Sequence, residues 1–284
     1  MTSPTAAPEM QEVRGPSALG GGARRFFDLL WLVSVTEFKR VYFGTVLGYV
    51  WSLVRPLMLF GVLLFVFTQV FKIGSEEAPH YPVLLLLGIV LFTFFSESTL
   101  NAVTSVVSQE GVVRKTQFPR LVIPLATALT GAFNLCLNMI VVFAFILAFG
   151  VDPTWTWLLF PFALVALLVF TATVSMALSV LYVRFRDVAI IWTVVAQVLF
   201  YGTPILYPIE ALHNETMERL LMVNPLAPIF EQVRVWVLEP NAPTAAEAAG
   251  GAAGLIPAAI IYVAVCAFAI WIFNREAPRI AEEL

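Results

Sequence analysis

Charged residues are scarce in this sequence of 284 residues. Asp, Glu, Lys and Arg together make up 12% of the chain, whereas hydrophobic residues make up 60% and the mean hydropathy is +0.88. Globular domains contain about 25% charged residues, and polar side chains cover much of their surface. The composition therefore excludes an ordinary soluble protein and predicts an integral membrane protein.

Cysteine, histidine and the familiar nucleotide-binding and hydrolase motifs are also rare or missing. Cys136 and Cys266 both lie in apolar runs, so we expect small hydrophobic side chains and no disulfide framework or metal cluster. His80 and His213 stand alone, and no G-x-x-x-x-G-K-[ST], G-x-S-x-G or H-E-x-x-H motif occurs. We therefore expect no catalytic residue, cofactor or metal in this chain, and no nucleic-acid partner.

The N-terminal part of the sequence divides into two segments. Residues 1–23 are rich in Pro, Ala, Gly and Ser, which predicts a disordered tail. Residues 24–42 have an imperfect amphipathic pattern with cationic residues at both ends, which predicts a helix lying in the membrane interface. A first spanning helix is disfavoured by charges within the segment, such as Asp28. The candidate interface residues are Trp31, Glu37, Lys39 and Arg40.

Long apolar runs occupy most of the remaining chain. A helix needs roughly 20 apolar residues to cross the hydrocarbon core, and six runs meet this requirement. They predict an all-α transmembrane domain over residues 43–284. Pro56 is expected in the first turn of the first span, and the long third span is expected to be tilted or broken at Pro124. The predicted spans are residues 51–71, 83–103, 121–149, 157–182, 188–207 and 255–273.

Lysine and arginine are distributed unevenly between the two sides of these spans. They are frequent before the first span, between the second and third, between the fourth and fifth, and after the sixth. The opposite side has only Lys72, Arg219 and Arg234, together with many glutamates. By the positive-inside rule, both termini are predicted to be cytoplasmic.

Residues 208–240, on the opposite side, have an irregular pattern. Two short helical patterns, 215–223 and 228–238, are separated by Asn224-Pro225. Each is too short to cross the membrane, yet both are too apolar for open water. We expect a re-entrant helical pair whose turn is buried in protein or lines a cavity. An ordinary loop on the bilayer surface is the alternative.

A short basic island, residues 110–124, lies between the second and third predicted spans. It contains Arg114, Lys115 and Arg120, the pair Phe118-Pro119 and a second proline at Pro124. The charges alone are explained by membrane topology. Topology does not require the aromatic residue and the proline stop, so the island is a candidate for contact with another molecule.

One carboxylate and several aromatic residues are candidates for a translocation pathway. Glu97 lies well inside a predicted span, where a carboxylate is either functional or satisfied internally by nearby Ser, Thr or Arg. Aromatic residues concentrate near the ends of the spans, where membrane anchoring explains many of them. Flat aromatic rings could also line a path for sugars. The pathway candidates are Phe92, Phe95, Glu97, Phe200, Tyr201 and Tyr207.

Several short motifs in a defined order resemble a known family over residues 24–273. They are Gly48-Tyr-Val-Trp51 followed by Pro56, Phe118-Pro119 with Pro124, Arg184-Phe-Arg186-Asp187, Thr203-Pro204 with Tyr207-Pro208, and Asn224-Pro225. Together they look like the ABC-2 permeases of bacterial polysaccharide export. The resemblance implies a multi-pass subunit of the bacterial cytoplasmic membrane that exports O-antigen, teichoic acid or a related lipid-linked glycan.

The resemblance also implies partners and contact residues. Two copies of a separate ATPase would bind ATP and Mg, and two copies of this chain would form a homodimer around the pathway. Residues 24–42 match the interface helix of the family, and residues 112–118 match a coupling helix that docks on the ATPase. The implied coupling candidates are Glu110, Val113, Arg114, Lys115, Phe118, Pro119, Arg120, Arg184, Arg186 and Asp187. Gln109 and Glu110 replace the basic, Asn-containing lead that is usual in the family.

Two other functions are open to such a chain. Other ABC-2 permeases export small hydrophobic drugs or lipids, and this is the alternative within transport. A membrane enzyme of lipid-linked sugar synthesis would need acidic residues, arginines or histidines clustered at one face. Acidic residues beside basic ones are sparse on the inner side, so the sequence disfavours an enzyme.

Overall fold

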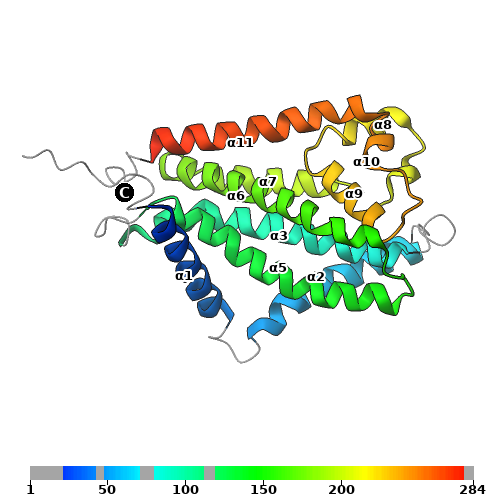
Figure 1. Ribbon diagram of the computed structural model, residues 1–284, viewed down its shortest axis with the longest axis horizontal. Coiled ribbons are helices and arrows are strands. Elements are labelled where there is room, and N and C mark those ends of the chain that lie inside the picture. Colours follow the sequence, from blue (N-terminus) through cyan, green and yellow to red (C-terminus); the bar gives the residue numbers. More distant parts are fainter. Residues whose placement is uncertain (1–21, 43–47, 71–79, 112–118, 278–284) are drawn as a thin grey trace, which may run out of the picture.

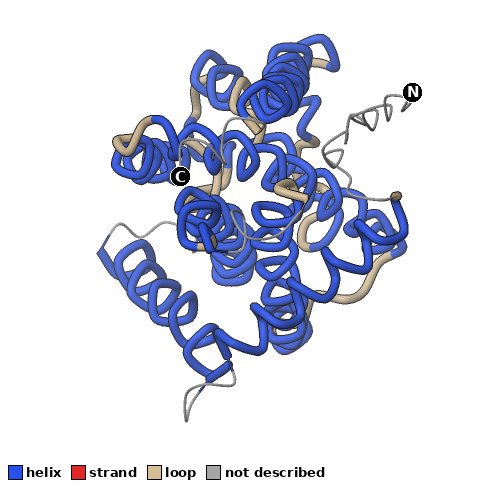
Figure 2. Tube along the Cα trace, turned by 90° about the vertical axis from the view of Figure 1, so that its left-hand side faces the viewer, coloured by secondary structure: helices blue, strands red, loops and turns tan. Residues whose placement is uncertain are grey.

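The computed structural model describes residues 22–42, 48–70, 80–111 and 119–277 (Figure 1). These residues form helices, short helical turns and connecting loops, and they include no strand (Figure 2). The described part of the chain is therefore an all-α, multi-pass membrane protein. Five of its helical segments are long and apolar enough to cross a membrane: Gly48–Val70, Tyr81–Ser108, Val122–Ala148, Trp155–Arg184 and Ala252–Glu276.

The helix α3, Tyr81–Ser108, is the central element of the bundle (Figure 1). Its side chains are buried around most of the helix, and Tyr81, Leu85 and Phe95 are completely inaccessible. A helix that is hydrophobic all round belongs in the interior of a protein or membrane. Four helices contact it: α2 (Gly48–Phe65), α5 (Val122–Ala148), α6 (Phe160–Arg184) and α7 (Val188–Tyr201).

The helix α2 begins earlier than expected and ends in a π-helical turn, η1 (Val66–Val70). Because α2 starts at Gly48, Pro56 lies inside the helix, and our placement of this proline in the first turn was wrong. The rings of Tyr49 and Tyr42 are 5.9 Å apart, which holds the additional turn against the preceding helix. The proline removes the N–H that would bond the carbonyl of Ser52.

The helix α5 runs without a break from Val122 to Ala148. Pro124 lies in its first turn, where the missing N–H has no helical partner to lose. The helix is therefore not broken at this proline, and the extra length of the third predicted span is a continuous helix.

The helix α1, Ala23–Tyr42, packs obliquely against α5 (Figure 1). The rings of Trp31 and Phe38 contact Phe133 at centroid distances of 5.3 and 6.0 Å. The Thr130 hydroxyl donates a hydrogen bond to the Ser34 carbonyl at 3.2 Å. The helix predicted over residues 24–42 is present, while its position in the membrane interface stays a prediction.

The helices α6 and α11 (Ile256–Glu276) pack together along one side of the bundle (Figure 1). Short helical turns, η2 (Trp155–Leu159) and η4 (Ala252–Leu255), precede them. The Tyr262 hydroxyl donates to the Ala166 carbonyl at 2.9 Å, and its ring stacks on Phe170 at 5.0 Å. One phenol thus joins the two helices through both a polar and an aromatic contact.

The helix α7 is shorter than the span predicted over residues 188–207. It has 14 residues, so its length is about 21 Å, and the hydrocarbon core is about 30 Å thick. The chain leaves the helix after Tyr201 because Gly202 and Pro204 follow. The helices of the next segment are η3 (Ile209–Leu212), α8 (Glu215–Leu221), α9 (Ala227–Val237) and α10 (Ala245–Ala248).

The two short helices expected in the outer segment correspond to α8 and α9, and Asn224 lies between them. Its amide nitrogen donates to the Gly202 carbonyl at 3.0 Å and to the Thr203 hydroxyl at 2.9 Å. Its amide oxygen accepts from the Leu226 N–H at 3.0 Å. One side chain therefore fastens the turn between α8 and α9 to the end of α7. Figure 1 shows α8, α9 and α10 together at the end of the bundle opposite the C-terminal end of α11.

Replacing Asn224 with leucine should destabilise the protein by roughly 2–4 kcal/mol, because three hydrogen bonds of about 0.5–1.5 kcal/mol each are lost. Thermal unfolding of the purified chain in detergent measures this change. The matched control is Asn241→Leu, since Asn241 is exposed. If both variants unfold at the wild-type temperature, the Asn224 contacts do not hold the segment.

Candidate functional site

An ion pair lies on the inner helices of the bundle. Arg55 of α2 donates from Nη1 to Oε1 of Glu97 on α3 at 2.8 Å. The Glu97 side chain is 37% exposed and the Arg55 side chain 79% exposed. A carboxylate within an apolar span is costly without a partner. The sequence left two interpretations of Glu97: a functional carboxylate, or one satisfied internally by Ser, Thr or Arg. Arg55 is such a partner, and the Glu97 side chain also remains accessible.

Two cavities meet at this ion pair. One, of about 420 Å³, lies between α2, α3 and α7, and Arg55 and Glu97 both line it. The other, of about 750 Å³, is lined by the same pair together with Tyr42, Trp51 and Asn101. Charged groups in a bundle interior normally face such cavities or one another, and this pair does both.

Four of the six pathway candidates come together. Phe92, Glu97, Phe200 and Tyr201 all line the cavity of about 420 Å³. Phe95 does not join them, because its ring is completely buried against Phe170 and Trp192, at 6.0 and 6.2 Å. Tyr207 is also outside the lining, and its hydroxyl donates to the Tyr201 carbonyl at 3.2 Å.

A polar strip on α7 was missed by sequence reasoning. Thr193 and Gln197 line the same cavity as Tyr201. The three residues recur every four positions, which places them on one face of a helix. This spacing within an otherwise apolar run was the available signal.

One arginine from each of the two segments proposed for coupling contacts the end of α11. Arg120 donates from Nη1 to the carbonyl of Ala277. Arg184, the last residue of α6, lies 3.7 Å from Glu276. Val106, Ile123 and Phe273 belong to one apolar cluster under these contacts. In the sequence, Glu276 was only an acidic residue that follows an apolar run, and nothing there indicated its contact with Arg184.

The remaining coupling candidates have fewer described contacts. Arg186 lies over the ring of Tyr182 at 4.9 Å, and Asp187 precedes α7 without capping it through its side chain. Pro119 is buried, and Glu110, the first residue of the basic island, is described as helical. Four candidates lie outside the described residues: Val113, Arg114, Lys115 and Phe118.

The interface-helix candidates lie along α1. The Trp31 ring contacts α5, whereas Glu37 and Arg40 form an i,i+3 ion pair at 3.3 Å in which only Arg40 is exposed. Lys39 lies in the last turn of the helix. Cations near a helix C-terminus interact favourably with its dipole.

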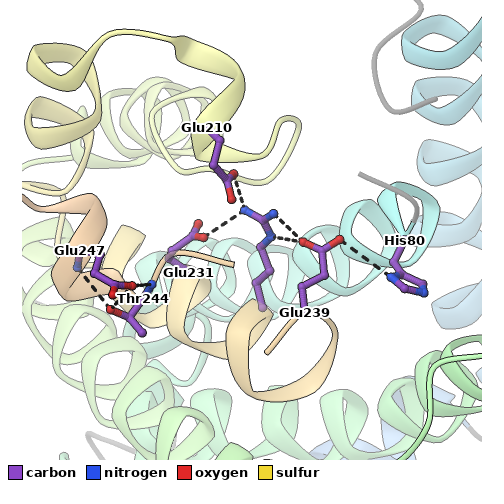
Figure 3. Close-up of polar contacts among 7 residues, drawn as sticks. His80, Glu210, Glu231, Glu239, Thr244 and Glu247 are labelled. Atoms are coloured by element: carbon purple, nitrogen blue, oxygen red, sulfur yellow. Dashed lines mark hydrogen bonds and ion pairs between the residues drawn. The ribbon is translucent and has the colours of Figure 1, made fainter. Parts of the chain in front are cut away.

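A second charged cluster lies at the opposite end of the bundle, around Arg234 of α9 (Figure 3). The Arg234 guanidinium donates to Glu210 at 2.7 Å and to Glu231 at 3.1 Å. It also donates to Glu239 from two nitrogens, at 2.9 and 2.5 Å. His80, just before α3, lies 4.0 Å from Glu239. The cluster therefore joins η3, α9 and the start of α3.

Burial changes the protonation of this cluster. The Glu231 side chain is 1% exposed, and desolvation raises its pKa from 4.5 to about 7 although Arg234 opposes the change. Burial by itself would lower the pKa of Arg234, but the hydrogen bond to Glu210 and the charges of Glu231 and Glu239 raise it. From the sequence, these residues could be recognised only as charged residues on the side predicted to be the outer one.

The sequence comparison identifies the family. Residues 28–238 match the family described as ABC-2 type transporter. The chain belongs to the ABC-2 type transporter family. The matched region begins in α1 and ends just after α9, so it contains both the Arg55–Glu97 pair and Arg234. The family comprises membrane subunits without ATPase motifs, and membership of the family implies an ABC ATPase partner.

Curated relatives of this ABC-2 transporter subunit cover most of its length. It is 30% identical over 202 residues to the O-antigen export system permease protein RfbA of Klebsiella pneumoniae, covering 71% of this chain and 76% of that protein. It is 27% identical over 210 residues to the protein of the same name from Myxococcus xanthus, covering 74% and 80%.

The stability of this ABC-2 transporter subunit should fall as pH rises from about 5 to about 7.5. In that range the folded state holds a proton on Glu231 that the unfolded chain releases, so unfolding is favoured by higher pH. The measurement is the thermal midpoint of the purified chain across this range. Glu231→Gln should flatten the fall.

The matched control for this prediction is Glu215→Gln, because Glu215 is exposed and also pairs with an arginine, Arg219. Both variants are compared again in a His80→Gln background, which removes the histidine from the cluster. An unchanged slope in Glu231→Gln would contradict the assignment.

Proposed function

We propose that this chain is the permease subunit of an ABC transporter that exports a lipid-linked polysaccharide across the bacterial cytoplasmic membrane. The observation that carries the proposal is the similarity to proteins named O-antigen export system permease, which extends over about three quarters of the length of those proteins. O-antigen, teichoic acid or a similar cell-surface glycan is the expected cargo. The chain performs no covalent chemistry itself.

We propose that two copies of the chain form the pathway, with two ATPase subunits that bind ATP and Mg. The cavity between α2, α3 and α7 supports this, because it combines aromatic, polar and charged side chains. The neighbouring surface of α7 is apolar and exposed, at Ile190, Val194 and Val198. A second copy against this side would enclose the cavity and cover these side chains.

We propose six crossings, with both termini, the 1–23 tail and α1 on the cytoplasmic side. The positive-inside distribution supports the orientation. The fifth crossing in chain order would combine α7 with residues 202–207, which continue beyond its end. Residues 208–240 would form a re-entrant segment at the outer face. The buried side chains of α9 support this, as do the hydrogen bonds from Thr156 and Trp157 to the carbonyls of Trp236 and Val237.

We propose that the ATPases act on the basic island and on residues 184–187. The contacts of Arg120 with Ala277 and of Arg184 with Glu276 support this proposal, because each places an arginine of one of these segments against the end of α11. A force on residues 184–187 would therefore act on α6 and α11, and a force transmitted through Arg120 would act on α5 and α11. By moving these helices, ATP hydrolysis in the partner chains would change the opening of the pathway between the two copies of this chain.

The proposed function is tested by deleting the gene in its own host. Surface polysaccharide should disappear while lipid-linked polymer accumulates inside the cell, and the wild-type gene should restore export. Immunoblotting of surface glycan and extraction of the lipid-linked pool measure both effects. Normal surface glycan together with new sensitivity to hydrophobic drugs would instead support export of small hydrophobic compounds.

Replacing Arg114 and Phe118 together with alanine should abolish coupling. The protein should remain in the membrane, but export should fall at least about tenfold, and the purified complex should no longer couple ATP hydrolysis to transport. Loss of a charge and an aromatic anchor removes the residue types that dominate protein interfaces. Surface glycan and ATPase activity are measured on the same strains.

The matched control for the coupling variant is Arg219→Ala with Leu220→Ala. This pair is also an arginine and a large apolar residue, it is exposed, and it lies on α8. It should export normally. Normal export and normal ATPase stimulation in the Arg114 and Phe118 variant would show that the coupling assignment is wrong.

A further inference from the structure

A third cavity, of about 350 Å³, lies between α1, α3 and α5. This size is within the range of small-molecule sites. It is lined by the last turn of α1, the C-terminal half of α3 and the first half of α5. Many of its lining side chains carry a neutral hydroxyl or amide, including Ser98, Asn101, Ser105, Gln109, Thr130 and Asn134.

Two of these side chains have a buried polar atom without a partner among the described residues. Ser98 is 3% exposed, and its hydroxyl oxygen makes no hydrogen bond. The amide oxygen of Asn134 is likewise buried and unpaired. Buried polar groups are normally hydrogen-bonded because an unpaired one destabilises the folded state. Both groups line the cavity, so a ligand there could supply the missing hydrogen bonds.

The position of Ser98 depends on a glycine in the facing helix. A Cβ atom at Gly131 would lie 2.0 Å from the Ser98 hydroxyl oxygen. The helices α3 and α5 therefore approach each other at this point only because residue 131 has no side chain. The hydroxyl consequently packs against the backbone of α5 at Gly131, in the wall of the cavity.

The charges of the cavity do not suit a phosphate group. Arg40 is the single cation among its described lining residues, and Glu37 pairs with it at 3.3 Å. The other acidic residue, Glu97, pairs with Arg55. Phosphate sites use arginine clusters or helix N-termini. The described lining contains no arginine cluster, and from the first turn of α5 it contains only Ile123.

The lining does suit a neutral ligand that has many hydroxyl groups. A hydroxyl both donates and accepts hydrogen bonds, amides do the same, and carboxylates accept. Tyr42 and Phe94 add ring surfaces against which the C–H face of a sugar can pack. The combination of carboxylates, amides, hydroxyls and rings matches the surface of a sugar.

We infer that this cavity binds a sugar ring of the exported polysaccharide on the side from which the chain is loaded. The inference rests on the proposed function and deepens it. The cavity is separate from the one between α2, α3 and α7, although Glu97 contributes to both. Ser98 and Asn134 would bind hydroxyl groups of the sugar, and Glu97 would accept from a further one.

The experiment uses the full chain with its ATPase in lipid nanodiscs. The probe is the polysaccharide of the host strain, released from its lipid by mild acid. Calorimetry should give an affinity about tenfold weaker for Asn134→Leu than for wild type, which is the effect of about one good hydrogen-bonding pair. Ser98→Ala should weaken binding about threefold or more. It should not lower thermal stability, because the hydroxyl that it removes has no hydrogen-bond partner among the described residues.

The matched control is Asn138→Leu. Asn138 lies one turn further along α5, is also buried, and also has an unpaired amide oxygen, but it does not line the cavity. It should bind the polysaccharide as the wild type does. Wild-type affinity in both Ser98→Ala and Asn134→Leu would overturn the inference, as would displacement of the polysaccharide by inorganic pyrophosphate.

The failure of this inference can be distinguished from that of the proposed function. If deleting the gene leaves surface polysaccharide unchanged, the chain is not the proposed exporter. If deletion abolishes export while Asn134→Leu and Ser98→Ala restore it fully, the exporter assignment stands and the sugar site is wrong. Reduced export in both variants, with normal export in Asn138→Leu, supports the inference.

Discussion

The burial of α3 around most of its surface limits where its polar side chains can point. Thr99 bonds the Phe95 carbonyl within the helix and accepts a hydrogen bond from Trp192 of α7. Glu97 meets Arg55 of α2, and Ser98 lines a cavity beside α5. Each of these groups lies within a long apolar helix, where burying a polar group without a hydrogen-bond partner is costly. The arrangement of the surrounding helices therefore satisfies some polar groups of α3 and leaves others facing cavities, and these cavities contain the candidate sites.

The long helices could be predicted because an apolar run of about 20 residues has few alternatives in a membrane protein. Their ends were less predictable. α2 already includes Gly48 and Tyr49, and the ring of Tyr49 packs on Tyr42 of α1, a contact between segments that a hydropathy pattern does not contain. α7 ends at Tyr201, where Gly202 and Pro204 follow, and the turn beyond it bonds Asn224. The hydropathy pattern did not mark this end, because apolar residues continue after Pro204.

The candidate site was predictable only in part. Glu97 was found because a carboxylate in an apolar run is conspicuous, and three aromatic candidates line its cavity. The completely buried Phe95 shows that an aromatic residue near a helix end can equally belong to the core. The Arg234 cluster could not be assembled from the sequence, because Glu210 and His80 reach it from separate segments. The cavity between α1, α3 and α5 lies at the contact of Gly131 with Ser98, and no sequence motif indicates that contact.

The outer segment is held by ionic and hydrogen bonds rather than by covalent cross-links. Arg234 joins three carboxylates from separate turns, and a guanidinium has enough donors in a fixed plane to bind several partners at once. Both cysteines of the chain are unpaired, and they lie in α5 and α11. The fold of this segment therefore needs no oxidising enzyme to mature, and reducing agents in the surroundings have no bond in it to break.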